Sequence, residues 1–315
     1  MFTKGLIVDI EQDKFLEPYL SQVKKQFQSI EFISSKDPDF KEKLADTEAL
    51  LCLITTQITK EVIDSAPKLK YLGVRAASFS GIDARHARSK NITVCNLGGY
   101  GTNAVAEFTI AALFKAARDL EASKQKARSG EIKLGMFASG MELRNKMLGV
   151  IGAGKIGSRV AEIALGIGMK VLYFARHDKP GLEKLGAQRS ELDEILKTSD
   201  CISLNLLLNQ ETKGIINKEK IALLKKGCIF VSPSPQALID SNAMLQKANT
   251  GDIKFVFDHA YELSHEEQQK FLNAKNCYVY TSIAIDTPET ITALWETFTS
   301  NVEQFAKGKP QNVVN

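Results

Sequence analysis

The sequence has no long apolar run, few cysteines and few histidines. A membrane-spanning helix needs about 18 or more consecutive apolar residues, and no segment of the 315-residue chain approaches this length. The first residues, MFTKGLIVDI, hold too short an apolar run for a secretory signal peptide. We therefore expect neither a membrane-spanning segment nor a membrane partner.

The five cysteines and four histidines are dispersed along the chain. An odd number of cysteines at irregular spacing matches neither a disulfide framework nor a zinc-binding pattern. Most of them lie in apolar, strand-like runs, so we interpret them as reduced core thiols of a cytoplasmic protein. The histidines do not cluster, and the sequence predicts no metal site. The cysteines are Cys52, Cys95, Cys201, Cys228 and Cys277.

Charge of one sign is not in excess either. The chain carries 41 lysines and arginines against 37 aspartates and glutamates, a formal net charge of +4. The basic residues are scattered, as in SKQKARSGEIK, whereas nucleic-acid-binding proteins concentrate them on one face. We therefore expect no nucleic-acid partner. The length is sufficient for two domains.

The chain does contain short apolar runs that alternate with helical patterns, which is typical of α/β folds with mostly parallel sheets. A first series predicts strands over 5–10, 49–55, 69–76 and 91–97, with helices over 13–27 and 59–66. A second series predicts strands over 146–154, 169–176, 200–208, 227–234, 254–260 and 277–284. Between the series lie a long helix over 103–120 and a polar surface excursion over 121–146, and a helix over 287–308 ends the chain.

The stretch LGVIGAGKIGSRVAEIALGIGMKVLYF carries the most specific motif. Gly152, Gly154 and Gly157 form G-x-G-x-x-G directly after an apolar strand and at the start of an amphipathic helix. In such a unit the glycines allow a tight turn and a close approach of a pyrophosphate, and the N-terminus of the helix offers free N–H groups. The unit predicts dinucleotide binding; the alternative is a glycine-rich turn without a ligand.

The residue at the end of the next strand selects the nucleotide. An acidic side chain there accepts a hydrogen bond from the ribose 2′-hydroxyl and marks NAD, but the sequence has Ala175, followed by Arg176, His177 and Lys179. Cations there favour a 2′-phosphate. We predict that NADP is preferred over NAD, with Arg176 as the main discriminator. The alternative is a solvated basic turn in an enzyme with a loose preference for NAD.

Over nearly its whole length the chain resembles the D-2-hydroxyacid dehydrogenase family. The stretches that carry the resemblance are VRAASFSGIDARHARSKNITVCN, GGYGTNAVAEFTIAALFKAAR, ELRNKMLGVIGAGKIG, KKGCIFVSPSPQALID and GDIKFVFDHA. The resemblance implies two Rossmann-like α/β domains with parallel sheets. A cofactor domain, residues 100–282, is inserted into a flavodoxin-like substrate domain, residues 1–99 and 283–315. It also implies a homodimer and a small-molecule substrate.

The resemblance assigns two further groups of residues. The substrate group consists of the SFSG loop, Ser78, Phe79, Ser80 and Gly81, with Arg75 and Tyr100. A surface or interdomain salt bridge is the alternative for Arg75, and a packed interdomain aromatic ring is the alternative for Tyr100. The cofactor group consists of Thr102, Gly152, Gly154, Lys155, Ile156, Gly157, Arg176, His177, Leu206, Ser232, Pro233 and Asp258.

The residues that carry the chemistry of the family are not preserved. Its reaction uses an arginine that fixes the substrate carboxylate, a histidine acid/base and a glutamate that orients the histidine. In this sequence the arginine position is Pro235, and the histidine position is Ser282 or, one residue along, Ile283. The glutamate position is Leu263, with Glu262 one residue earlier.

Three residues are candidates for the missing catalytic roles: Glu262, His259 and Ser282. His265 is a further histidine near this part of the chain, and both histidines are equally interpretable as surface residues. Two functions follow. The first is an atypical NAD(P)-dependent oxidoreductase that acts on a 2-hydroxy or 2-keto acid or a related substrate. The second is a catalytically silent dinucleotide-binding sensor or scaffold.

Overall fold

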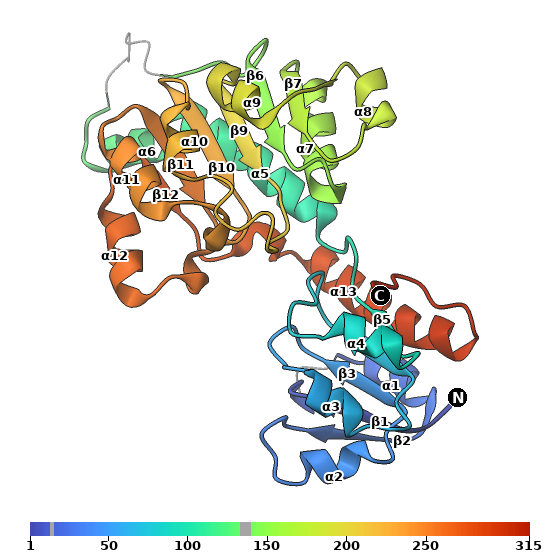
Figure 1. Ribbon diagram of the computed structural model, residues 1–315. Coiled ribbons are helices and arrows are strands. Elements are labelled where there is room, and N and C mark those ends of the chain that lie inside the picture. The colour runs from blue at the N-terminus through green and yellow to red at the C-terminus, as the bar shows by residue number, and fades with distance from the viewer. Residues whose placement is uncertain (13–15, 133–139) are drawn as a thin grey trace. The chain divides into compact units, whose positions relative to one another are not determined.

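The computed structural model describes residues 1–12, 16–132 and 140–315. They divide into two compact units, Met1–Tyr100 with Thr287–Asn315 (unit 1) and Gly101–Asp286 (unit 2). Each unit has its own parallel sheet and its own hydrophobic core (Figure 1). The predicted α/β fold class with two parallel sheets is confirmed. The roles of the units as substrate and cofactor domains stay a prediction.

The sheet of unit 1 has five parallel strands in the order β2-β1-β3-β4-β5. Its central strands are buried along their whole length, as the continuous apolar runs require of a sheet covered on both faces. The order is that of a flavodoxin-like sheet. The strands are β1 (Phe2–Val8), β2 (Phe27–Ile33), β3 (Ala49–Cys52), β4 (Tyr71–Val74) and β5 (Thr93–Cys95).

Helices cover both faces of this sheet. Apolar residues of α1 (Tyr19–Lys24) and α13 (Pro288–Ala306) pack on one face, and those of α2 (Phe40–Leu44), α3 (Lys60–Asp64) and α4 (Ala84–Ser89) pack on the other. The long helix α13 begins with Pro288 in its first turn and a Thr287 side chain that accepts the N–H of Thr290, a sequence-readable start signal.

The sheet of unit 2 has seven parallel strands in the order β12-β11-β10-β9-β6-β7-β8. Neighbouring strands β6 and β9 are far apart in sequence, so the connections diverge between them. The strands are β6 (Met147–Ile151), β7 (Lys170–Phe174), β8 (Gln188–Arg189), β9 (Cys201–Leu204), β10 (Cys228–Ser232), β11 (Ile253–Phe257) and β12 (Cys277–Val279).

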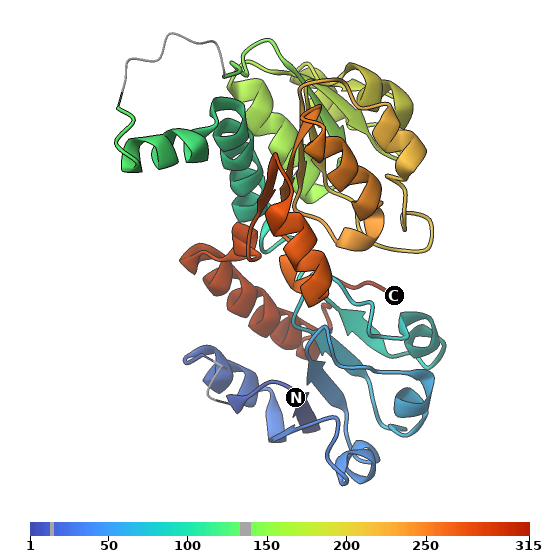
Figure 2. The same cartoon turned by 90° about the vertical axis from the view of Figure 1, so that its left-hand side faces the viewer.

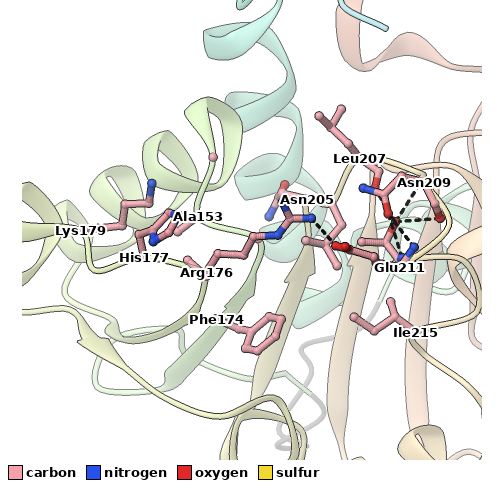
Figure 3. Close-up of a pocket in the computed structure, with 15 residues that line it drawn as sticks. Ala153, Phe174, Arg176, His177, Lys179, Asn205, Leu207, Asn209, Glu211 and Ile215 are labelled. Atoms are coloured by element: carbon pink, nitrogen blue, oxygen red, sulfur yellow. Dashed lines mark hydrogen bonds and ion pairs between the residues drawn. The ribbon is translucent and has the colours of Figure 1, made fainter. Parts of the chain in front are cut away.

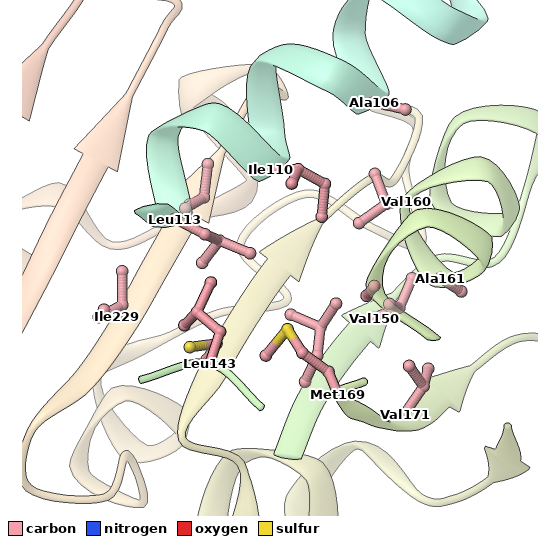
Figure 4. Packing of buried hydrophobic residues seen from close by; sticks show 14 of the residues in the cluster. Ala106, Ile110, Leu113, Leu143, Val150, Val160, Ala161, Met169, Val171 and Ile229 are labelled. Carbon is pink, nitrogen blue, oxygen red and sulfur yellow. The ribbon is translucent and has the colours of Figure 1, made fainter. Parts of the chain in front are cut away.

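Two groups of helices enclose this second sheet. On one face α5 (Thr102–Arg118) and α7 (Lys155–Gly166) pack on β6 and its neighbours, with Ile110, Leu113 and Val160 directed toward the strands (Figure 4). The other face is covered by α9 (Leu192–Thr198), α10 (Lys218–Ala222), α11 (Ser241–Asn249) and α12 (His265–Asn273). The short helix α8 (Pro180–Lys184) contributes Leu182 to the α5 side.

One expectation about local structure is wrong, and another is incomplete. The predicted helix over 13–27 ends at Lys24 among the described residues, and Phe27 instead starts β2, a strand that the sequence analysis did not predict. Residues 13–15 lie outside the described residues. The predicted excursion over 121–146 contains most of a regular helix, α6 (Leu120–Arg128), none of whose residues is buried. Figure 2 shows α6 extending away from the sheet of unit 2.

The described cysteines agree with their predicted role. All five are free, four are buried, and Cys277 is half-buried. Among the described residues, no helix is both long and apolar enough to span a bilayer.

Candidate functional site

The glycine-rich loop joins β6 to α7 at the point where the connections of the unit 2 sheet diverge. Gly152 and Ala153 donate their N–H groups to the carbonyl of Phe174, at 2.9 and 3.3 Å, which ties the loop to the end of β7. Ligands of open α/β sheets bind at such a divergence, outside the carboxyl ends of the strands. No side chain caps α7 at Gly154, and the positive end of the helix dipole at this N-terminus attracts an anion.

The three glycines are required for different reasons. A Cβ on Gly157 would lie 2.0 Å from the carbonyl oxygen of Gly152, and one on Gly152 would lie 2.6 Å from the carbonyl oxygen of Asn205. At both positions the neighbouring main chain of the protein leaves no room for a side chain. At Gly154 a Cβ would meet nothing within 4 Å. The open space in front of Gly154 fits the close approach of a pyrophosphate.

The opposite wall is the loop that follows β9. The Thr212 hydroxyl donates to the carbonyl of Leu207 at 2.6 Å and accepts the N–H of Asn209 at 2.9 Å. The Asn209 side chain accepts the N–H groups of Glu211 and Thr212, at 2.9 and 3.0 Å. This internal network gives a polar loop a single conformation at the edge of the sheet.

Together the two walls enclose a pocket of about 470 Å³. It is lined by the glycine-rich loop, by the segment after β7 and by the loop after β9 (Figure 3). The lining includes six residues of the predicted cofactor group or its sequence context: Gly152, Gly154, Arg176, His177, Lys179 and Leu206.

Arg176 has a partner that the sequence analysis missed. Its Nη2 lies 2.6 Å from Oε2 of Glu211, and both side chains are more than 70% exposed, at 71% and 74%. The ion pair spans the pocket between the β7 side and the β9 side (Figure 3). A sequence signal for Glu211 did exist, because it is a charged residue in the loop after a buried parallel strand.

The remaining cofactor candidates lie elsewhere in unit 2. Thr102 is the first residue of α5, and its hydroxyl is buried without a hydrogen-bond partner. Lys155 begins α7, and Ile156 packs against the core beneath that helix. Ser232 is fully buried at the end of β10, where its hydroxyl donates to the carbonyl of Ser234 at 3.4 Å, and half-buried Pro233 follows.

At the carboxyl ends of β11 and β12, Asp258 and Ser282 contact one another. The Ser282 hydroxyl donates to the carbonyl oxygen of Asp258 at 2.7 Å. The buried Asp258 carboxylate accepts the N–H groups of Ile283 and Ala284, at 3.0 and 3.1 Å. Burial raises the pKa of Asp258 above its ordinary value more than these N–H groups lower it. The hydroxyl of Ser282 is thus used in a hydrogen bond to the main chain.

Beside this pair, Glu262 and His259 form a second one. Oε1 of Glu262 lies 2.9 Å from Nδ1 of His259, and Oε2 accepts the main-chain N–H of Gln236 at 2.8 Å. The Tyr261 hydroxyl lies 3.2 Å from the same Nδ1. Burial raises the pKa of Glu262, but the hydrogen bonds from His259 and Gln236 outweigh it, and the pKa lies below its ordinary value. Glu262 is therefore an ionised carboxylate near neutral pH.

The 3₁₀ turn η3 (Ala260–Glu262) sets this geometry. Leu263, which follows it, is buried in the core of unit 2, so the acidic side chain one residue earlier is the one that reaches the loop after β10. That loop contains Pro235, directly before Gln236. His265 lies exposed at the start of α12.

In unit 1, Arg75 follows β4 and has an unusual environment. Its guanidinium lies 5.0 Å from the ring centroid of Trp295, and its Nε is buried without a hydrogen-bond partner. Burial lowers the pKa of Arg75, partly offset by nearby Tyr100. No ion pair joins Arg75 to a carboxylate among the residues that the structure describes. A half-buried cation without a counter-ion is suited to an anionic ligand.

The SFSG loop lies four residues past β4 in the same unit. The hydroxyl of Ser78 accepts the N–H of Ser80 at 3.4 Å, and Phe79 accepts the N–H of Ile82 at 3.0 Å. Within the described part of the chain, the N–H groups of Ser78 and Phe79 donate to no protein acceptor. Gly81 is needed because a Cβ there would lie 2.6 Å from the carbonyl oxygen of Thr56.

Known proteins share both the sequence and the fold of this chain. The family described as "D-isomer specific 2-hydroxyacid dehydrogenase, NAD binding domain" matches residues 110–284. A glyoxylate reductase of Thermococcus litoralis is 33% identical over 282 residues, which cover 87% of this chain and 85% of the relative.

Two solved structures are similar over nearly the whole chain. D-lactate dehydrogenase from Aquifex aeolicus, complexed with NAD and lactic acid, is 26% identical with a TM-score of 0.83, covering 97% of this chain and 96% of that one. An acyclic imino acid reductase in complex with NADPH and D-Arg is 25% identical with a TM-score of 0.85, covering 98% of this chain and 100% of that one. The chain therefore belongs to the D-isomer specific 2-hydroxyacid dehydrogenase family, a family of NAD(P)-dependent oxidoreductases.

Proposed function

We propose that this chain transfers a hydride between a nicotinamide dinucleotide and a small 2-oxo acid or a related substrate, with an atypical active site. The observation that carries the proposal is the pocket of unit 2, where an uncapped helix N-terminus and the open face of Gly154 lie at the divergence of the sheet. When bound there, the dinucleotide supplies the hydride. The relatives named above include reductases and dehydrogenases of small acids.

The proposed cofactor contacts follow the lining of the pocket. The N–H groups of Gly154 and of Ile156, in the first turn of α7, bind the pyrophosphate. Arg176 and His177 bind the adenosine ribose side, and Leu206 packs beside it. Thr102, Lys155, Ser232 and Pro233 lie outside this pocket and are proposed contacts along the rest of the cofactor.

We propose a preference for NADP over NAD, because no acidic residue stands at Ala175 and Arg176 lines the pocket. Arg176→Ala should weaken NADPH binding by about 1.5–3 kcal/mol, the range of a charge-assisted hydrogen bond, and leave NADH binding nearly unchanged. Lys184→Ala, at an exposed site of α8 outside the pocket, is the control. Equal affinity of the unmodified protein for the two cofactors would contradict the preference.

The acid/base function is proposed for His259, with Glu262 as the carboxylate that orients it. The two are in contact, and Glu262 is held by the Gln236 N–H next to the position where the family has its arginine. An imidazole hydrogen-bonded to a carboxylate is a suitable proton donor near neutral pH. Ser282, whose hydroxyl donates to a carbonyl, acts as a structural link between β11 and β12.

The substrate carboxylate is proposed to bind residues of unit 1. Among the residues that the structure describes, no carboxylate pairs with the Arg75 guanidinium, and no protein acceptor binds the N–H groups of Ser78 and Phe79 in the SFSG loop. Tyr100 lies near enough to Arg75 for each to influence the other's pKa: burial raises that of Tyr100, and Arg75 opposes the rise. These groups would bind a carboxylate in a chain whose sequence has Pro235 where the resemblance expects an arginine.

A second candidate function is the reduction of a 2-imino acid. The solved acyclic imino acid reductase with NADPH and D-Arg favours it, as does the local chemistry. The carbon of a protonated imine accepts hydride without a proton from the protein, because the nitrogen already carries both hydrogens of the amine. The positive charge on this nitrogen suits a site where proline replaces an arginine. The Glu262 carboxylate would be its counter-ion.

We propose that this chain forms a homodimer, as the resemblance to the family implies. A surface around α6 supports the proposal. The helix α6 has no buried residue, and Phe114, Leu120 and Ile132 near it are exposed. Light scattering during gel filtration should give twice the mass of the 34.7 kDa chain. A mass of one chain at micromolar concentration would contradict the homodimer.

A coupled assay separates these functions. The absorbance of NADPH and of NADH is followed with glyoxylate, hydroxypyruvate and pyruvate, each with and without ammonium. Oxidation with the acid alone supports the 2-oxo acid reductase, and oxidation that requires ammonium supports the imine reductase. Cofactor binding without oxidation under any of these conditions would leave only a silent dinucleotide sensor.

A further inference from the structure

Glu211 is the one acidic side chain among the described residues that line the pocket of unit 2. Its carboxylate lies 2.6 Å from the Arg176 guanidinium, the same group that would receive a 2′-phosphate. Figure 3 shows the two side chains meeting from opposite walls. Arg176, the cation proposed to distinguish the two cofactors, therefore already forms an ion pair with an acidic side chain of the protein itself.

The segment that carries Arg176 is anchored on its own side of the pocket. Arg189, on β8, pairs with Asp178 at 2.7 Å and donates to the carbonyl oxygen of Arg176 at 3.3 Å. The N–H of Lys179 donates to the Tyr173 hydroxyl at 2.8 Å. The main chain of the segment is held, and Asp178, which pairs with Arg189, is not among the residues that line the pocket. The exposed Arg176 side chain can therefore exchange one anion for another without rearranging its loop.

The pair is weak enough to be displaced. Both of its side chains are more than 70% exposed, and an ion pair in water stabilises by about 0–1 kcal/mol. A phosphate monoester carries about 1.5 to 2 negative charges and three strong acceptor oxygens. Lys179 lines the same pocket and forms no ion pair among the residues described, so it is a second cation available to the phosphate.

We propose that Glu211 is a specificity-determining residue that competes with the 2′-phosphate of NADP for Arg176. With a 2′-hydroxyl cofactor the ion pair stays closed. With a 2′-phosphate cofactor Arg176 turns to the phosphate, and the released Glu211 carboxylate remains nearby as a like charge. Glu211 thus lowers the preference for NADP that Arg176 and Lys179 create. This inference rests on the proposed function, because it concerns the same dinucleotide site.

The test measures dissociation constants of NADPH and NADH by fluorescence titration, with no substrate present. Glu211→Gln should tighten NADPH about three- to tenfold, the sum of a lost competing pair and a lost repulsion across several ångströms. NADH should change by less than about twofold, since its ribose carries no charge. Glu219→Gln removes an equal charge from the exposed first turn of α10, outside the pocket, and should change neither constant.

A double variant shows whether Glu211 affects NADPH binding through Arg176. In an Arg176→Ala background, Glu211→Gln should improve NADPH binding by clearly less than in the unmodified chain, because no guanidinium remains to be contested. The bisphosphate fragment adenosine 2′,5′-bisphosphate should repeat the NADPH result, and AMP should repeat the NADH result. These fragments lack the nicotinamide, so they report on this end of the site alone.

Each outcome has a defined meaning. An unchanged NADPH constant in Glu211→Gln, with normal cofactor binding, would overturn the inference and leave the proposed function standing. So would a loss of NADH affinity, since it would make Glu211 a ribose ligand instead of a competitor. If the unmodified protein binds neither dinucleotide nor fragment, the proposed function fails together with the inference.

Discussion

Glu262 accepts the main-chain N–H of Gln236 at 2.8 Å, although 26 residues separate them in the sequence. The contact joins the turn after β11 to the loop after β10, and the second oxygen of the same carboxylate contacts His259. A histidine and a carboxylate are thus in contact directly after β11. We propose this pair as the acid/base, in place of the histidine that the resemblance assigns to the position of Ser282, after β12.

His259→Gln should lower kcat for 2-oxo acid reduction by about 10²–10⁴-fold, the usual contribution of a general acid/base. Glu262→Gln should lower it less, because the imidazole stays and only its orientation is weakened. Neither change should alter the dissociation constant of NADPH by more than about twofold, since Glu262 and His259 are not in the pocket lining. His265→Gln, at the exposed start of α12, is the control. A His259→Gln variant with full activity would rule out this assignment.

Two glycine substitutions should have opposite consequences. Gly154→Val places its side chain in open space and should leave the melting temperature nearly unchanged, but it should weaken dinucleotide binding at least about tenfold by blocking the close approach. Gly157→Val puts a Cβ 2.0 Å from a carbonyl oxygen and should destabilise the fold by several kcal/mol. Calorimetry and cofactor titration measure both. A Gly154→Val protein that binds NADPH normally would contradict the placement of the pyrophosphate.

Restoring the missing family residues should act cooperatively. Pro235→Arg adds a cation beside the loop that Glu262 contacts and should lower KM for pyruvate, with little gain in kcat. Ser282→His alone lacks that cation. The double variant should gain more in kcat/KM than the product of the single gains, because both groups act on one transition state. Purely multiplicative effects would argue against a shared action of the two groups.

Acid stability should depend on Asp9 in unit 1. Its carboxylate is partly buried, which raises its pKa, but hydrogen bonds from the Ser35 N–H and the Thr56 hydroxyl, at 2.7 and 2.8 Å, outweigh burial and lower it. A group with a lowered folded pKa stabilises the fold above its unfolded pKa, about 3.9, and loses this contribution as the pH falls through the folded value.

Asp9→Asn should therefore destabilise the fold by about 1–2 kcal/mol at pH 7, and the difference from the unmodified protein should shrink as the pH drops below about 4. Denaturant unfolding at several pH values provides the measurement. Asp39→Asn, at an exposed position before α2, should show no such dependence. A constant difference at every pH would mean that Asp9 does not titrate with folding.

Features encoded by neighbouring residues were predictable. The glycine loop is one, because the clash of a Cβ on Gly157 with Gly152 is a local property of the turn. The edge strand β2 was missed because FQSIEFI mixes polar and apolar residues without strict alternation and follows a helical pattern, and its pairing with β1 decides its conformation. Helix α6 was missed because none of its residues is buried, so it carries no core-facing periodicity.

Contacts that cross the sheet were not predictable from local patterns. Arg176 and Glu211 are 35 residues apart and meet because β6 lies between β7 and β9 in the strand order. Glu262 reaches Gln236 only because a 3₁₀ turn buries Leu263 and displaces the acid by one position. In both cases the residue types were visible in the sequence, and the strand order and turn geometry were needed to show their partners.

The most direct test of hydride transfer uses NADPH that carries deuterium at both hydrogen positions of C4 of the nicotinamide ring. The labelled cofactor is incubated with the protein and glyoxylate, hydroxypyruvate or pyruvate, with and without ammonium, and the products are analysed by mass spectrometry. We predict a product of at least one acid with a single deuterium at C2. A cofactor that binds with full occupancy and keeps all of its deuterium under every condition would contradict the account.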